Sequence, residues 1–108
     1  MSQVKNFTAI VHSGIAGFLI EVKGEVNCGM LTVMPSLTKK VPQGANPKIL
    51  ILDVLPASKD PNGNFQEAQY SENIHNQDTY TQVELIDSEG SSIVTIPVQP
   101  AHAEASAS

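Results

Sequence analysis

The chain has 108 residues, which is enough for one domain with a small core and too short for a large two-lobed enzyme. Only 16% of the residues are charged, the net charge is −5, and all six basic residues are lysines. An acidic chain without arginine repels polyanions, so we expect neither nucleic acids nor anionic membranes as partners.

The cysteine content and the apolar runs bear on the cellular compartment. Cys28 is the single cysteine, so an intramolecular disulfide is excluded. The first residues lack the apolar core of a secretory signal, and the longest apolar run, residues 49–52, is far shorter than a membrane helix. These features predict a cytoplasmic protein.

Apolar residues recur at every second position in the first third of the chain, which is the period of a β-strand. Residues 4–12 and 18–23 show this alternation and are separated by a short turn that contains glycine. The alternation resumes after Gly24 and continues through residues 25–34. We interpret Gly24 as a bend within one long strand, because a one-residue hairpin loop is too short.

The most apolar segment of the chain lies between two loops that are rich in proline. Residues 35–47 contain three prolines, and we expect an irregular loop there. Residues 48–55 are apolar on both faces except for Asp53, which predicts a central strand. Residues 56–64 contain an Asp-Pro pair and an Asn-Gly pair, which predict a loop.

The last third predicts an edge strand followed by a hairpin. Residues 65–74 fit neither the helical nor the strand period well, so we expect a weak or edge strand. Residues 79–87 and 91–98 are rich in β-forming residues and are joined by a Ser-Glu-Gly turn, which predicts an antiparallel hairpin. Pro97 indicates that the end of this hairpin lies at a sheet edge.

Together these segments predict an all-β fold, a small antiparallel β-sandwich or flattened barrel of six to seven strands. Residues 1–99 are expected to form a single domain. Residues 100–108 are small and polar, and we expect a disordered C-terminal tail. No segment combines the helical period with a capping signal. The pattern fits several strand orders, so sandwich and barrel both stay open.

Side chains that catalyse reactions or bind metals are scattered along the sequence. His75 and Asp78 lie three positions apart, but in a predicted loop, so we expect no metal and no other cofactor. Cys28, His12 and Asp53 could form a nucleophilic triad, but Cys28 follows an apolar alternation typical of a core thiol. The sequence therefore favours a protein that is not an enzyme.

A small β domain without catalytic motifs favours a protein-interaction or structural module that acts through loops or an edge strand. Self-association as a homodimer, by sheet extension along residues 65–74, fits the same reasoning. A small-ligand carrier with an apolar pocket is the alternative, followed by an enzyme with dispersed catalytic residues.

The residues that we expect to contact a protein partner lie in the two long loops or flank the polar loops. Exposed polar side chains and clustered aromatic rings are common at such interfaces, although aromatic rings also cover cores. The candidates are Lys39, Lys40, Asn46, Lys59, Asn62, Phe65, Tyr70 and Tyr80.

Overall fold

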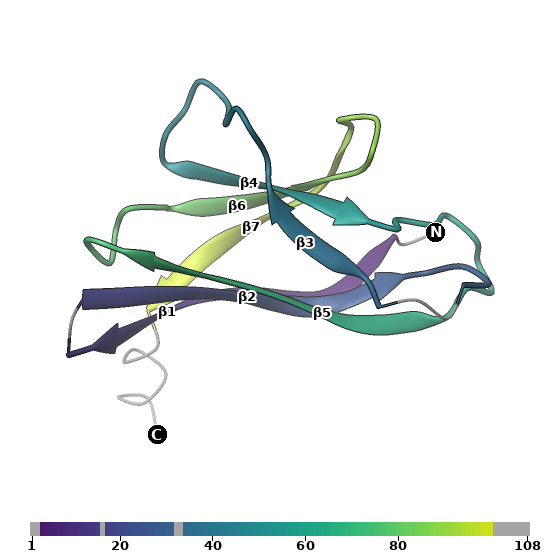
Figure 1. Cartoon of the computed structure of the whole chain (residues 1–108), viewed down its shortest axis with the longest axis horizontal. Helices are drawn as coiled ribbons and strands as arrows, with labels where there is room; N and C mark the ends of the chain where they lie inside the picture. The colour runs from purple at the N-terminus through teal and green to yellow at the C-terminus, as the bar shows by residue number, and fades with distance from the viewer. Residues whose placement is uncertain (1–2, 16, 32–33, 101–108) are drawn as a thin grey trace.

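The computed structural model describes residues 3–15, 17–31 and 34–100. These residues form seven β-strands and no helix (Figure 1). The strands are β1 (Val4–Gly14), β2 (Gly17–Asn27), β3 (Ser36–Lys39), β4 (Ile49–Leu55), β5 (Phe65–Ile74), β6 (Gln82–Ile86) and β7 (Ser92–Pro100).

The seven strands form one nearly closed, barrel-like sheet in the order β3-β4-β6-β7-β1-β2-β5 (Figure 1). The pairs β1–β7 and β4–β6 are parallel, and the other neighbours are antiparallel. The all-β prediction is confirmed, whereas the sandwich and the purely antiparallel pairing are wrong. Both parallel pairs join strands that are distant in the chain, and such pairings leave no trace in a local alternation pattern.

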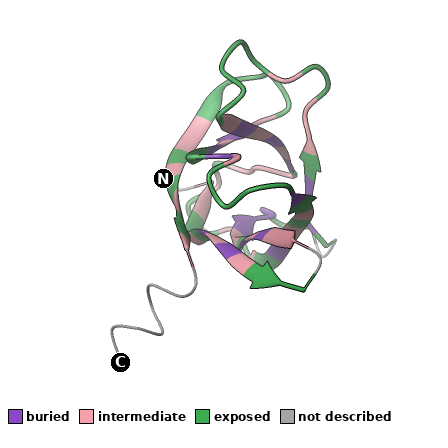
Figure 2. Cartoon of the chain, turned by 90° about the vertical axis from the view of Figure 1, so that its left-hand side faces the viewer, coloured by how far each residue is buried: buried purple, intermediate pink, exposed green. Residues whose placement is uncertain are grey.

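The core lies inside the curled sheet and is built from alternate residues of its strands (Figure 2). The side chains with no exposed surface include Ile20, Val22, Val26, Leu50, Leu52, Val54, Val83 and Leu85. In β4 the alternation places Asp53 on the half-exposed face, together with Ile49 and Ile51. The carboxylate therefore needs no buried partner.

Gly24 lies within β2, as the sequence predicted, and β1 shows why a glycine is needed there. The register of β1 against β2 shifts between Lys5 and Thr8, and Asn6 has a φ of 58°, so that Asn6 and Phe7 form a bulge. A Cβ atom on Gly24 would lie 2.8 Å from the Cα of Phe7 and would overlap its ring. The missing side chain thus leaves the space that Phe7 occupies.

β2 ends at Asn27, so the predicted continuation of the strand is wrong for residues 28–31 and 34, and residues 32–33 lie outside the described residues. Asn27 is buried, and its side-chain Nδ2 donates a hydrogen bond to the backbone oxygen of Asp60 (2.8 Å). Its Oδ1 accepts one from the Gly29 N–H (2.9 Å), and its backbone oxygen accepts one from the Ser58 N–H (2.9 Å). These bonds turn the chain away from the sheet and tie the predicted loop, residues 56–64, to the end of β2.

Three further predictions that depended on prolines are wrong. β3 lies within the predicted loop 35–47, where it pairs with the last residues of β4 directly after Pro35. β7 is an interior strand between β6 and β1, so Pro97 does not mark an outer edge of the sheet. Pro100, which we assigned to the tail, is the last residue of β7, and residues 101–108 lie outside the described residues. The prediction of an edge strand at residues 65–74 is confirmed by β5.

Gly24→Ala should lower the free energy of unfolding by about 1–3 kcal/mol, because the added methyl group overlaps Phe7 and the bulge must shift. Urea unfolding measures this loss. Gly14→Ala is the matched control, since a Cβ at Gly14 meets its nearest atom, the Gly17 oxygen, at an ordinary 3.5 Å. Equal stability of the two variants would contradict the proposed role of Gly24.

Candidate functional site

The barrel closes where the two edge strands, β3 and β5, come together, and we call this strip, residues 34–39 and 67–72, the seam (Figure 1). In the part of the chain that the structure describes, β3 pairs only with β4 and β5 pairs only with β2. The facing edges of β3 and β5 are therefore not joined by a backbone ladder, and side chains make the connection instead.

Four polar side chains join the two strands at one end of the seam. Glu72 of β5 accepts hydrogen bonds from the hydroxyl of Tyr70 (2.6 Å, to Oε1) and from that of Tyr80 (2.9 Å, to Oε2). Lys39 of β3 donates to Glu72 Oε2 (3.3 Å) and to the Tyr80 hydroxyl (3.2 Å). We call these four residues the seam cluster.

Burial and hydrogen bonds shift the pKa values in the seam cluster, downward for the carboxyl group of Glu72 and upward for the two tyrosines. Burial would raise the pKa of Glu72, but hydrogen bonds from Tyr70, Tyr80 and Lys39 outweigh burial and lower it. Burial and the neighbouring Glu72 raise the pKa of Tyr70, and burial is also the main reason why the pKa of Tyr80 is raised. At neutral pH the cluster is thus one lysine–carboxylate pair with two neutral phenols.

The other end of the seam is hollow and partly apolar. A depression of about 440 Å³ is lined by Lys23, Met34, Pro35, Glu67, Ala68 and Gln69. Met34, which lines this depression, is 78% exposed. Leu55, which pairs with Ser36, is also exposed. An exposed methionine in the lining of a hollow is typical of adaptable binding surfaces.

The structure brings together three of the residues that the sequence singled out, Lys39, Tyr70 and Tyr80. The sequence reasoning missed Glu72, which connects them. The available signal was the alternation in β5, where Tyr70 and Glu72 continue the inward face that begins with the buried Ala68. Tyr80, whose hydroxyl donates to Glu72 on this face, is buried.

The other predicted contact residues take no part in the hydrogen bonds of the seam cluster. Lys40 and Asn46 lie in the β3–β4 connection, where Asn46 Oδ1 accepts a hydrogen bond from the Lys48 N–H (2.9 Å). Lys59 and Asn62 are exposed in the loop tied to Asn27. Phe65 begins β5 and packs under the ammonium group of Lys5, 4.3 Å from the ring centre.

The residues considered for catalysis are not assembled into a site. His12 pairs with Leu19 near the start of β2, whereas Cys28 follows the end of that strand, so the two lie far apart. His12 contacts Glu21 instead (3.2 Å). Cys28 is buried, which raises the pKa of its thiol and confirms the expected core position.

Metal ligands do not cluster in the described residues, which hold no group of three or more histidine, cysteine, aspartate or glutamate side chains that could bind an ion. His75 and Asp78 are exposed in the connection after β5, as expected. The same residues include no helix that is long and apolar enough to cross a membrane. Comparison with family models, curated proteins and solved structures finds no match.

Glu72→Gln should lower the free energy of unfolding at pH 7 by about 1–3 kcal/mol, because it removes the charge that three donors face. The pKa of Glu72 is lowered in the folded state, so its stabilisation is present above the pKa of the unfolded chain, about 4.3, and is lost as the pH falls through the folded value. The difference between wild type and variant should therefore narrow between pH 7 and pH 3.

Urea unfolding at several pH values measures this difference. Glu67→Gln is the matched control, since Glu67 is exposed on the same strand. A constant difference between wild type and Glu72→Gln over that pH range would show that the charge of Glu72 does not hold the seam together.

Proposed function

We propose that this protein is a non-enzymatic interaction module that binds an extended segment of a protein partner along the seam. The observation that carries the proposal is the combination of a free edge of β5 with the hollow beside Met34. A free strand edge offers backbone donors and acceptors to an added strand, and a neighbouring hollow accepts one of its side chains.

The chemistry of the hollow indicates what the partner segment carries. Met34, Pro35 and Ala68 supply apolar surface, so the hollow fits a medium-sized apolar side chain. Lys23 and Glu67 also line the hollow and carry opposite charges, so the site does not select a strongly charged partner.

The outward side chains of β5 argue for a selective rather than an indiscriminate edge. Glu67, Gln69, Ser71 and Asn73 are all exposed and polar. Polar and charged residues on an edge strand disfavour random pairing with other sheets. A partner that supplies both backbone hydrogen bonds and an apolar side chain overcomes this barrier.

The small-ligand carrier receives less support than the interaction module. Aliphatic side chains from β2, β4 and β6 occupy the space inside the curled sheet. A carrier needs an enclosed apolar volume of a few hundred Å³ for its cargo. The hollow at the seam instead borders a strand edge, which suits a peptide.

The test places a photo-crosslinking residue at Gln69, on the outward face of β5, in cells that make the protein. We expect a cross-linked product of discrete mass whose partner peptide can be mapped by mass spectrometry. Met34→Asp should reduce the yield of this product about tenfold, because the hollow then repels an apolar side chain.

The same photo-crosslinking residue at Glu89, in the exposed β6–β7 turn, is the control and should not give the product. A product that joins two copies of this chain would assign the edge of β5 to self-association. A product that forms equally from both positions, or that ignores Met34→Asp, would refute the proposal.

A further inference from the structure

β1 and β7 are joined along only part of their length. Their parallel ladder consists of Ala9 with Val98, Ile10 with Gln99, and Val11 with Pro100. The same register continued toward the start of both strands would place Phe7 beside Ile96 and Val4 beside Ile93. No such pairs form in the described residues, so the sheet divides there, and we call this place the split, residues 3–7 and 93–96.

Two features of the sequence explain why the ladder stops. The Val98 N–H donates a hydrogen bond to the backbone oxygen of Thr81 (3.0 Å), which lies on the β6 side of β7. Backbone groups of successive strand residues point to opposite sides, so the backbone of Pro97 faces β1, where proline has no N–H to donate. On the opposite strand, the bulge at Asn6 and Phe7 bends β1.

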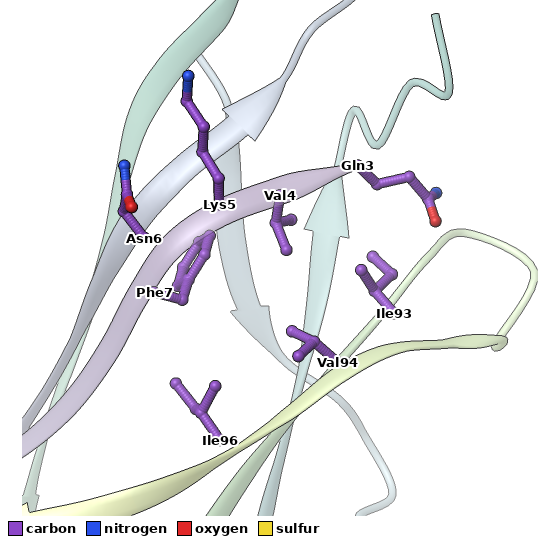
Figure 3. Close-up of a pocket in the computed structure, with 8 residues that line it drawn as sticks. All are labelled: Gln3, Val4, Lys5, Asn6, Phe7, Ile93, Val94 and Ile96. Carbon is purple, nitrogen blue, oxygen red and sulfur yellow. The ribbon is translucent and has the colours of Figure 1, made fainter. Parts of the chain in front are cut away.

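The split encloses a groove of about 420 Å³ between two strand edges (Figure 3). Val4 and Phe7 point from β1 into the space beside β7, and Ile93, Val94 and Ile96 point into it from β7. Lys5 and Asn6 point away. The groove is therefore apolar at its centre and bordered by backbone on both sides.

An extended peptide segment is the ligand that can form backbone hydrogen bonds with both strands that border the groove. Because β1 and β7 run in the same direction, one added strand can be antiparallel to both, which is the more stable pairing. Its inward side chains would cover Val4, Phe7 and Ile96 and would need to be small, since these side chains already reach into the groove.

We propose that the split binds residues 101–108 of a second copy of this chain as an added strand. This segment alternates strictly between alanine and a polar residue, which is the period of a strand with one small apolar face. The alanines are Ala101, Ala103, Ala105 and Ala107. Eight extended residues reach about 26 Å, more than the roughly 17 Å of β1 that borders the groove.

The segment fits the split of another copy better than that of its own chain. β7 ends at Pro100, opposite Val11, beyond the closed part of the ladder. To enter its own split, the segment would have to reverse and pass over three paired rows before reaching Phe7. That path uses about 13 Å of its length and leaves half of the segment for the groove.

Sedimentation equilibrium of the full chain and of a chain that ends at Pro100 tests the proposal. The full chain should self-associate weakly, with the associated fraction rising as the protein concentration rises, because alanine buries little apolar surface. Truncation should lower the association constant about tenfold or more. A synthetic peptide of residues 101–108 should compete with this self-association. The same peptide with Ala103→Pro and Ala105→Pro should not compete, because the two prolines remove two backbone N–H donors.

Variants of the folded domain separate the split from other surfaces. Ile93→Lys places a charge in the groove and should weaken association as strongly as truncation, whereas Ile10→Lys, on the outward face of β1, should not. Met34→Asp at the seam should also leave this association unchanged, so failure of the split and failure of the proposed function are distinguishable.

Three outcomes would overturn the proposal. The truncated chain could associate like the full chain, which would mean that copies meet without the segment. The full chain could stay monomeric without binding the peptide. Truncation could lower the stability of a monomer, which would place the segment in its own split.

Discussion

The fold depends on a carboxylate that joins two strands which the backbone does not join. β3 is short and β5 is long, and both end the sheet, so the barrel would stay open along their facing edges. Glu72 closes it by accepting hydrogen bonds from both neighbouring tyrosines and from Lys39 on the opposite strand. The cost of partly burying the carboxylate is offset by three donors, so the connection holds only as a set. Because side chains rather than a ladder close the barrel, the edge of β5 keeps its capacity to pair.

The sheet is thus incomplete in two places, and each has its own cause. At the seam, the short β3 cannot match the length of β5, which leaves a hollow beside Met34. At the split, Pro97 and the bulge in β1 end a ladder that both strands are long enough to continue. The seam offers a free edge on one side, whereas the split offers two edges that face each other. An added segment therefore extends the sheet at the seam but completes it at the split, and the two sites suit different partners.

The sequence was sufficient for features that depend on neighbouring residues. The alternation in residues 4–12 and 18–23 and the continuous apolar run in residues 48–55 predicted three strands, and the Ser-Glu-Gly turn predicted the hairpin of β6 and β7. β3 was missed because its four residues follow a proline and are too few to show a period. The prediction for Pro97 failed because a proline prevents backbone pairing on only one side of its strand. At Pro97, β7 is not paired with β1 but stays paired with β6, so β7 remains an interior strand. Glu72 was missed because its role depends on Lys39, which is distant in the chain and becomes its neighbour only when the barrel closes.

The buried Asn27 determines how far the loops can change over evolution. Surface loops of β domains ordinarily tolerate insertions, since their closure entropy grows slowly with length. Residues 56–64 have lost that freedom, because the backbones of Ser58 and Asp60 are hydrogen-bonded to Asn27, and Gly63 leaves no room for a side chain beside it. The turn at residues 88–90 has kept it, since a Cβ atom on Gly90 would meet nothing within 4 Å. Relatives of this chain should therefore vary in length at the β6–β7 turn. They should keep the length of residues 56–64, although the composition of that loop suggests that it tolerates change.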